Sequence, residues 1–277
     1  MNMVDERYEL VTLVFCLAGN YQNPEKTAYQ QELAQTFAAH KDHPAVAYAG
    51  TCTIGIDMVF SYACHLTRQG DGFVLIANLE GLRFGEAYGW TREAAEEFLP
   101  MLNAFYRDAK FGAFFRAHTA FFERESARFA KKHYNKIDLE WFRPYIDPAK
   151  LHCVLGFWHV GCGAVADGHA YFVINEELAK KYFDFILMVY CLPFAWPLAE
   201  EWYAQNPAFQ KLCNWDIGNS YHGSATPARD NARRHVVRAY AILYEVQHGG
   251  KLEKLLHKYE KQGLSRIGEV YEMIAAS

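Results

Sequence analysis

Features that mark several specialised protein classes are absent from this sequence. No run of Lys or Arg is longer than two residues and the formal net charge is −4, which gives no sign of nucleic-acid binding. The most apolar stretch, residues 186–199, falls short of the roughly 18–20 residues that span a bilayer, and it contains Pro193 and Pro197. We therefore predict neither a nucleic-acid partner nor a membrane partner.

The cysteines give no sign of a disulfide framework. There are seven, an odd number, scattered through apolar segments without a CxxC pair. This pattern favours buried free thiols in a reducing compartment. The charged start Asp5-Glu6-Arg7 also lies where a secretory signal needs an apolar stretch, which predicts a cytoplasmic protein. A secreted chain whose leader had been removed would look the same.

Familiar catalytic signatures are missing as well. The sequence has no Gly-x-Ser-x-Gly nucleophile elbow and no Gly-x-x-x-x-Gly-Lys-Ser/Thr phosphate loop. It has no His-Glu-x-x-His motif, and no two of its 12 histidines are four residues apart. The usual helical pair of zinc-binding histidines therefore cannot be built from this chain.

What is present is a large apolar and aromatic content, mostly at helical spacing. Hydrophobic residues make up 51% of the chain and aromatic residues 16%, which predicts a globular fold with a substantial core. The Phe-rich face of residues 111–132 is expected to be core, since aromatic stripes at helical spacing are usually buried. The predicted helices are 5–17, 24–39, 56–66, 91–107, 111–132, 176–193 and 229–247, with a short one from Leu198 and two around Gly263.

The pattern changes at Leu151. Residues 151–158 and 169–175, on either side of a glycine-rich turn, are predicted to form two strands of an antiparallel hairpin. Residues 69–89 show no clear period and are predicted to be loop. The sequence thus indicates an α+β protein, mainly helical with one small antiparallel sheet. We expect a single domain over 1–277, with a helical part (1–150) followed by the hairpin and further helices (151–277).

The order of these segments is similar to that of a known protein family. The matching segments, in chain order, are Val4-Asp5-Glu6-Arg7-Tyr8-Glu9-Leu10, His43-Pro44, Phe105-Tyr106, the glycine-rich hairpin, Val237-Arg238-Ala239 and Gly263-Leu264. They resemble the bacterial DUF4932 family, whose members look like zinc metallopeptidases of the gluzincin type. The resemblance covers most of the chain and implies a zincin-like architecture.

The resemblance also implies a zinc site, but its positions are occupied here by other residue types. The family's motif is His-Glu-Phe-x-His-Ser-Phe on one helix, with a further Glu on a later helix. Two His one turn apart and the distant Glu would hold Zn²⁺, and the first Glu would be the general base. Aligned on the flanking aromatics, the two His fall at Met188 and Leu192, the base at Val189 and the distant Glu at Arg234. These side chains cannot bind zinc, so we predict no zinc cofactor.

Arg234 is the most informative of these replacements. If it faces the former metal cavity, a fixed cation with apolar walls would favour a small anion, such as a carboxylate terminus or a phosphate. Arg238, one turn further on, could share that face, although it has a counterpart in the family and is there plausibly structural. The alternative is that Arg234 faces water or pairs with an acidic neighbour, since most Arg side chains do so. The acidic candidates are Glu200, Glu201, Asp216 and Asp230.

Two other groups of residues could carry chemistry. The first is a set of possible metal ligands on the predicted hairpin, namely His152, His159, Cys162 and His169. In a straight strand, however, His152 and His159 would lie on opposite faces. The second is Tyr221-His222, an acid/base pair in a polar loop that could face the former cleft, where polar residues are common in any case.

Three functional hypotheses follow. The first is a metallopeptidase-like protein without catalysis that binds a peptide or a small anion in the former active-site cleft. The second is a hydrolase with a rebuilt site that uses residues such as His159, His169, Tyr221 and His222. The third is a structural or interaction protein whose cleft has filled with side chains. The losses at Met188, Val189, Leu192 and Arg234 favour the first.

Overall fold

The computed structural model describes residues 3–20, 27–52, 54–79, 82, 90–158, 161–179, 183–215 and 227–276. The chain groups into two compact units. Unit 1 comprises Met1–Asp138 and Lys150–Phe183, and unit 2 comprises Leu139–Ala149 and Asp184–Ser277. Each unit includes residues from both sides of residue 150, and the strands that follow this residue belong to unit 1. Whether the chain acts as one domain stays a prediction.

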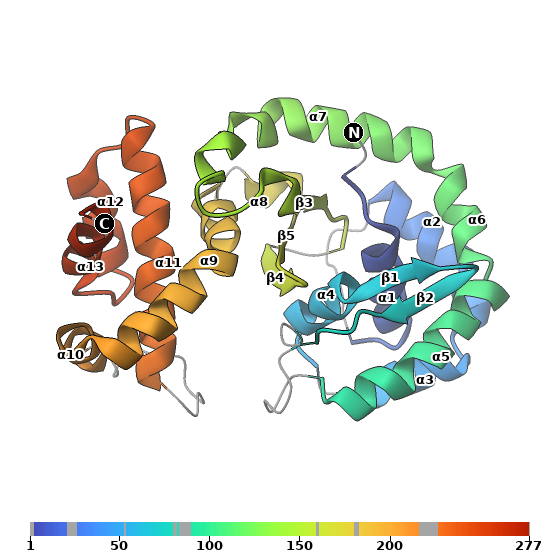
Figure 1. The fold of residues 1–277 in the computed structure, drawn as a ribbon. Coiled ribbons are helices and arrows are strands. Elements are labelled where there is room, and N and C mark those ends of the chain that lie inside the picture. The colour runs from blue at the N-terminus through green and yellow to red at the C-terminus, as the bar shows by residue number, and fades with distance from the viewer. Residues whose placement is uncertain are drawn as a thin grey trace. The chain divides into compact units, whose positions relative to one another are not determined.

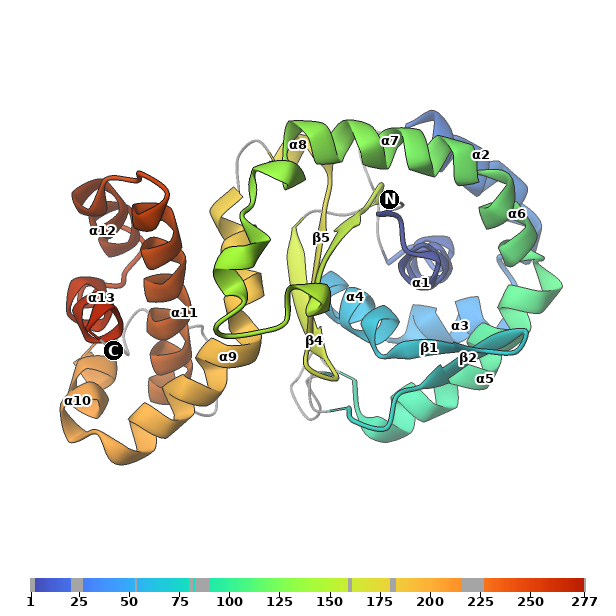
Figure 2. The same ribbon diagram turned by 45° about the horizontal axis from the view of Figure 1, so that its top comes forward.

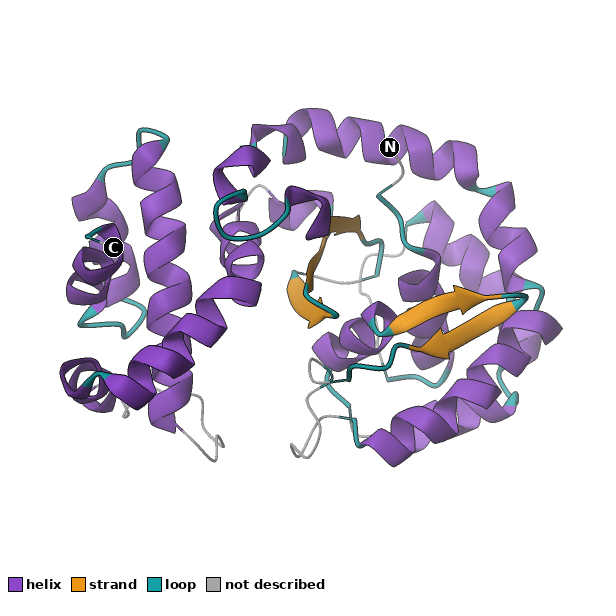
Figure 3. Cartoon of the chain, viewed as in Figure 1, coloured by secondary structure: helices purple, strands orange, loops and turns teal. Residues whose placement is uncertain are grey.

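Unit 1 contains most of the elements. Its helices are α1 (Glu6–Leu17), α2 (Ala28–Thr36), η1 (Ala38–His40), α3 (Pro44–Thr51), α4 (Ile56–Cys64), α5 (Arg92–Asp108), α6 (Phe111–Ala117), α7 (Thr119–Lys132), η2 (Tyr134–Lys136) and α8 (Glu176–Ala179). Its strands are β1 (Leu66–Gln69), β2 (Gly72–Leu75), β3 (Leu151–Leu155), β4 (Cys162–Ala166) and β5 (His169–Ile174). The fold is mainly helical with small sheets, as the sequence predicts (Figures 1 and 3).

α1 is the central helix of unit 1. The Asp5 side chain accepts a hydrogen bond from the amide N–H of Arg7 and so caps its start, and Gly19, with φ +85°, follows its end. Every residue from Tyr8 to Phe15 is buried. Figure 2 looks nearly along α1 and shows the other helices of unit 1 and the β1–β2 hairpin surrounding it. A helix that is apolar on all sides is expected in such a place.

The sheet of β3, β4 and β5 differs from the predicted hairpin. Its order is β3-β5-β4, in which β3 is parallel to β5 and β4 is antiparallel to β5. The prediction that residues 151–158 and 169–175 pair antiparallel was therefore wrong. The true hairpin is β4–β5, closed by Asp167 and Gly168 with φ of 49° and 71°, so that Ala166 faces His169. Two successive residues with positive φ form the tight turn that matches strand twist.

A second hairpin was not predicted. Its second strand, β2, falls in the stretch 69–89 that was predicted to be loop, and its first strand, β1, begins at Leu66, the last residue of the helix predicted over 56–66. β1 and β2 pair antiparallel, with Gln69 opposite Gly72 and Gly70-Asp71 as the turn. Gly70 has φ +56°, and glycine at the first central position is a hairpin signal. The prediction missed it because each strand is only four residues long and β1 exposes three of its four.

The helix predicted over 111–132 is two helices, α6 and α7, which meet at His118. The His118 ring nitrogen Nδ1 lies 2.9 Å from the carbonyl oxygen of Phe114, and the Thr119 hydroxyl donates to that of Arg116 at 2.8 Å. These side chains bond to carbonyls of the last turn of α6, which competes with continuing the helix. Phe111, Phe122 and Phe129 are buried as predicted, whereas Phe114, Phe115 and Phe121 on the same stretch are half-buried.

Unit 2 is helical throughout its described residues. Its elements are η3 (Leu139–Phe142), η4 (Pro148–Lys150), α9 (Phe183–Gln205), α10 (Pro207–Trp215), α11 (Pro227–Gln247), α12 (Leu252–Glu260) and α13 (Ile267–Ala275). The helix predicted over 176–193 does not end at Pro193. α9 continues past Pro193 and Pro197 to Gln205 and includes the start of the short helix predicted from Leu198. An interior proline costs about 3 kcal/mol, and burial of an apolar helix on this scale can offset that.

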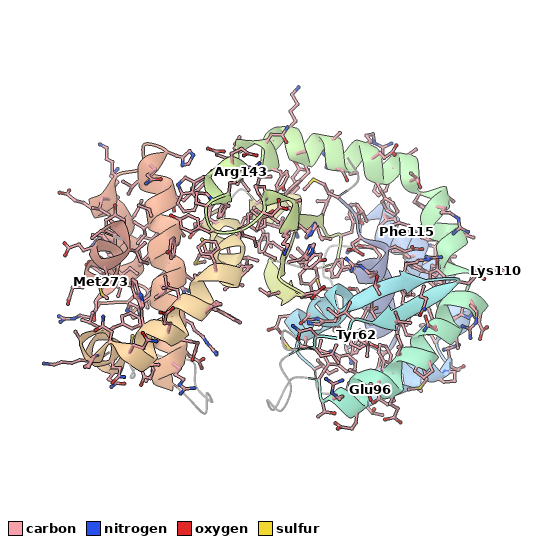
Figure 4. All side chains as sticks on the ribbon, viewed as in Figure 1. Tyr62, Glu96, Lys110, Phe115, Arg143 and Met273 are labelled. Carbon is pink, nitrogen blue, oxygen red and sulfur yellow. The ribbon has the colours of Figure 1, made fainter. Side chains whose placement is uncertain are left out.

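Aromatic rings pack closely in the core of unit 1. In unit 1 the Tyr62 hydroxyl donates to the carbonyl of Ala95 at 3.0 Å, and its ring lies 4.5 Å from that of Trp90. Figure 4 shows Tyr62 inside unit 1 and Glu96 of α5 pointing outward. None of the helices in the described part of the chain is long and apolar enough to cross a membrane.

Candidate functional site

The segment that the resemblance aligns with the zinc-binding helix lies on α9 in unit 2. All residues from Ile186 to Cys191 are buried there. Met188 is 8% exposed and Val189 is 5% exposed, while Leu192 is half-buried. The positions assigned to the first histidine and to the general base thus carry apolar side chains packed into the interior.

α9 and α11 lie side by side within unit 2. Arg233 Nε of α11 donates to Glu200 Oε1 of α9 at 2.8 Å, and the Arg233 guanidinium lies 5.3 Å from the centre of the Trp196 ring. Closer to the start of α9, the ring of Phe194 on α9 and the ring of Tyr240 on α11 meet edge to face, with centres 5.0 Å apart. The face of α11 that meets α9 therefore includes Arg233 and Tyr240.

Arg234 directly follows Arg233 on α11, and its side chain is half-buried. Successive residues are about 100° apart around a helix axis, so Arg234 does not share the direction of Arg233. Two of the acidic partners considered for Arg234, Glu200 and Asp230, form ion pairs with Arg233. A third, Asp216, lies outside the described residues. Whether Arg234 binds an anion stays a prediction.

Arg238 lies on the side of α11 that meets α12. Its Nη1 donates to the backbone carbonyl of Arg234 at 3.3 Å. Burial raises the pKa of Tyr259 on α12, and the positive charge of Arg238 opposes that rise. The Tyr259 hydroxyl and Lys258 Nζ both donate to Asp184, at 3.3 and 2.6 Å. Arg238 thus belongs to a polar cluster between helices, which favours the structural interpretation of this residue.

The predicted hairpin residues are brought together only in part. His152 Nε2 and His169 Nδ1 are 2.8 Å apart, because β3 and β5 are parallel neighbours in the sheet. Cys162 pairs with Val173, four residues along β5 from His169, which corresponds to roughly 13 Å. His159, Tyr221 and His222 lie outside the described residues.

The His152–His169 contact has the geometry of a hydrogen bond. The nitrogen separation of 2.8 Å is shorter than the roughly 3.5 Å of rings in face-to-face contact, so the rings meet at their edges. One imidazole must then donate its N–H and the other must accept it. Burial, and then His169 and Arg7, lower the pKa of His152, which favours its neutral form.

This geometry favours a shared proton over a shared metal ion. A metal ion would need both lone pairs to point at a third position about 2.0–2.1 Å from each nitrogen. Here the two nitrogens point at each other, so at least one ring would have to turn. Among the described residues, no three His, Cys, Asp or Glu side chains gather closely enough to hold a metal ion.

The sequence analysis did not single out Glu9, which is the most unusual ionisable group of unit 1. It lies in the buried stretch of α1 and is 0% exposed. The Tyr29 hydroxyl and the Trp158 indole N–H each donate to its Oε2 at 3.1 Å. Burial raises the pKa of Glu9 from 4.5 to about 8, although these two hydrogen bonds and one from the backbone of Phe157 oppose the rise. The signal in the sequence was an acid that directly precedes the mostly apolar stretch 10–17 of the predicted helix.

Comparison with models of known protein families, with curated proteins and with solved structures finds no match to this chain.

Proposed function

We propose that this chain is a metallopeptidase-like protein without the zinc ligands and the general base, and that it binds a peptide or a small anion. A zincin-like architecture is part of this proposal. The observation that carries it is the burial of Met188 and Val189 on α9, at positions where the family would place a metal-binding histidine and the base.

The arrangement of α9 and α11 supports the proposal. Two histidines on one helix and a glutamate on a later helix can meet at one metal ion only if those helices are neighbours. α9 and α11 are neighbours in unit 2, joined by the Arg233–Glu200 ion pair and by Phe194 against Tyr240. The two assigned helices are thus neighbours, and the same contacts place Arg234 level with the residues beside Glu200 rather than with Met188.

The side chains at the four positions give the proposed site a different chemistry. A thioether and two aliphatic side chains neither bind Zn²⁺ well nor take a proton from water. A guanidinium is a permanent cation with hydrogen-bond donors that match a carboxylate or a phosphate. A ligand at Arg234 would therefore be an anion, and a peptide would be held by its C-terminal carboxylate.

A metal and activity measurement tests the loss of catalysis. The purified protein is analysed for bound metals and incubated with casein and short peptides, with and without a chelator. We expect less than one equivalent of zinc and no hydrolysis that the chelator removes. One equivalent of tightly bound zinc, together with proteolysis that its removal abolishes, would overturn the proposal.

Binding is tested by thermal unfolding in phosphate and with a short peptide that ends in a free carboxylate. The amidated peptide is the matched ligand control. We expect both anionic ligands to raise the midpoint in the wild type, and we expect Arg234→Ala to lose that rise while Arg233→Ala keeps it. An unchanged response in Arg234→Ala would exclude the anion site.

The alignment itself is tested by restoring the ligands. The triple variant Met188→His, Leu192→His, Arg234→Glu places two imidazoles one turn apart and a carboxylate on the neighbouring helix. If the three positions share one site, the triple variant should bind zinc stoichiometrically and the double variant that keeps Arg234 should bind it more weakly. Equal binding by the two variants, or none by a folded triple variant, would contradict the assigned positions.

A hydrolase with a rebuilt site is the second candidate, favoured by the His152–His169 hydrogen bond. Two imidazoles that share a proton can move it to or from a substrate, and Tyr171 stacks on His152 at 4.6 Å. If this pair is catalytic, His152→Ala and His169→Ala should each abolish hydrolysis of an activated ester. Activity that survives both substitutions would dismiss this candidate.

A further inference from the structure

The contact between His152 and His169 holds the two imidazole rings in one plane. Their planes differ by 9°, the two nitrogens are 2.8 Å apart and the ring centres are 5.1 Å apart. That separation of the centres is close to the largest that a 2.8 Å contact between two five-membered rings allows. The two nitrogens therefore point at each other along one line, which is the geometry of a well-aligned N–H···N hydrogen bond.

The hydrogen bond uses a different ring nitrogen of each histidine. In His152 it is Nε2, at the tip of the side chain, and in His169 it is Nδ1, the nitrogen nearer the backbone. The nitrogens that remain are Nδ1 of His152, close to its own backbone, and Nε2 of His169, at the tip of that side chain. Both side chains are half-buried, so solvent reaches them. A small molecule that approaches the pair would therefore meet Nε2 of His169 more readily.

A third ring holds His152 in place. In the parallel pair of β3 and β5, His152 lies opposite Tyr171, and His169 is two residues before Tyr171 on the same face of the sheet. The rings of His152 and Tyr171 stack with planes 17° apart and centres 4.6 Å apart, whereas the centres of His169 and Tyr171 are 6.1 Å apart. His152 is thus packed against a phenol ring as well as hydrogen-bonded, which suits a residue that orients another.

The surrounding charges disfavour a positive charge on His152. Arg7 lies over the Tyr171 ring, with its guanidinium carbon 5.5 Å from the ring centre. Burial, and then His169 and Arg7, lower the pKa of His152, and Asp5, which pairs with Arg7 at 2.6 Å, raises it by less. When the pair binds an additional proton, the positive charge is therefore more favourable on His169.

Lys150, directly before β3, is a further cation near the pair. Its Nζ lies 3.8 Å from the place that a Cβ at Gly168 would take, in the turn before His169. The Lys150 side chain is half-exposed, so water and salt screen its charge. The Arg7 side chain is only 20% exposed, and its charge is screened less.

We propose that His169 is the residue through which this pair takes up and releases a proton, and that His152 is its positioning residue. The Nδ1–H of His169 donates to Nε2 of His152, which leaves a free lone pair on Nε2 of His169 in the neutral pair. The chemical use of these roles rests on the second candidate function, ester hydrolysis. There the attacking water gives its proton to Nε2 of His169 as its oxygen bonds to the carbonyl carbon, and the same proton passes to the leaving oxygen as the ester bond breaks.

Nitrogen NMR of the wild type, labelled with ¹⁵N in its histidine rings, tests the two roles. The signals of the pair are assigned by their loss in His152→Gln and in His169→Gln. We expect a scalar coupling between Nε2 of His152 and Nδ1 of His169, with the proton bonded to His169. As the pH is lowered, Nε2 of His169 should gain a proton while His152 is still neutral. Absence of the coupling, a proton bonded to Nε2 of His152, or a first charge on His152 would overturn the proposal.

Two substitutions of His152 separate its positioning role from its packing. His152→Gln keeps a hydrogen-bond acceptor and loses the ring, whereas His152→Phe keeps a ring against Tyr171 and loses the acceptor. We expect the proton of neutral His169 to stay on Nδ1 in the wild type and in His152→Gln, and to move to Nε2 in His152→Phe, because the hydrogen bond sets the tautomer. An unchanged tautomer in a folded His152→Phe would mean that His152 only packs, and would refute the positioning role.

Hydrolysis of an activated ester tests the chemical use separately. We expect kcat to fall at least about 10-fold in His152→Phe, with little change in KM, and to recover most of that loss in His152→Gln. A larger loss in His152→Gln than in His152→Phe would contradict the positioning role. A wild type that hydrolyses no ester would dismiss the second candidate function, while the NMR results would still decide which histidine exchanges the proton.

Discussion

α1 and α9 are both buried helices, and they differ in what they bury. From Tyr8 to Phe15 every residue of α1 is buried, and that stretch includes the polar side chains of Glu9 and Thr12. From Ile186 to Cys191 every residue of α9 is buried, and the only polar atoms of these side chains belong to Tyr190 and Cys191. The first helix keeps an acid where burial of a charge is costly, whereas the second is apolar at the positions that the proposed alignment assigns to a zinc ligand and a general base.

The comparison teaches where to look for function in an apolar helix. A buried apolar residue is the ordinary outcome of packing and carries little information about activity. A buried acid requires partners, and Glu9 has two donors from segments far away in the sequence. The predictions below separate these two kinds of buried helix.

The largest effect is expected from placing a carboxyl group on α9. Val189→Asp puts an acid at a position that is 5% exposed, without the donors that Glu9 has on α1. We predict a loss of about 3–5 kcal/mol in the free energy of unfolding at neutral pH. Urea unfolding measures it, and Val189→Asn has nearly the same shape without the charge. Equal losses of stability in the two variants would mean that the shape of the new side chain, and not its charge, destabilises the fold.

The next effect concerns the pH dependence of stability. The pKa of Glu9 in the folded state, about 8, lies above its ordinary value of 4.5, so the folded protein keeps a proton that the unfolded chain has released. This contribution to stability is complete below about pH 4.5 and is lost as the pH rises through 8. Between pH 6 and 9 the wild type should lose about 3 kcal/mol more than Glu9→Gln. If the free energies of unfolding of the two proteins changed in parallel with pH, the raised pKa of Glu9 would be contradicted.

A smaller effect is expected from Tyr29→Phe, which removes one donor and keeps the ring. The loss of a buried hydrogen bond should cost about 1 kcal/mol. The Tyr29 hydroxyl lowers the pKa of Glu9, so its removal should raise that pKa and move the pH at which stability is lost to higher values. Tyr62→Phe removes a buried hydroxyl elsewhere in unit 1 and should leave the pH dependence of stability unchanged. A shift to lower pH in Tyr29→Phe would be inconsistent with its role as donor.

The smallest effect is expected at the contact between α9 and α11. Arg233 is 36% exposed and pairs with Glu200, so Arg233→Ala should cost about 0.5–1 kcal/mol. The loss should shrink at high salt, because exposed charges are screened. Arg229, whose Nη1 is 3.9 Å from Glu200 Oε2, offers the matched control and should cost less. A loss above about 2 kcal/mol would show that the pair is part of a larger network.

Much of the local structure could be predicted from the sequence. The Asp5 cap, Gly19 and the apolar run between them place α1 within a residue, and Thr91 marks the start of α5. The helices on either side of Gly263 were likewise predicted. These features are local, because caps, glycines and apolar spacing act within a few residues.

The sheet and the candidate sites could not be predicted as well. The parallel pairing of β3 with β5 arises because β4 returns through the Asp167-Gly168 turn and takes the other edge of β5. The small residues of β4 looked like part of a turn. For the same reason the sequence grouped His152, Cys162 and His169 as possible ligands, whereas the register joins the two histidines and separates Cys162.

The sequence by itself determined that the usual zinc-binding helix cannot exist in this chain, since no two histidines are four residues apart. It also placed α1, α5 and α11 to within about two residues, because helical periodicity and caps are local properties. Only the tertiary structure decided that Glu9 is enclosed with Tyr29 and Trp158, and that the rings of His152 and His169 meet. The pKa and the partners of a side chain depend on groups that folding brings from distant parts of the chain. The spacing of residues along the sequence does not reveal these long-range contacts.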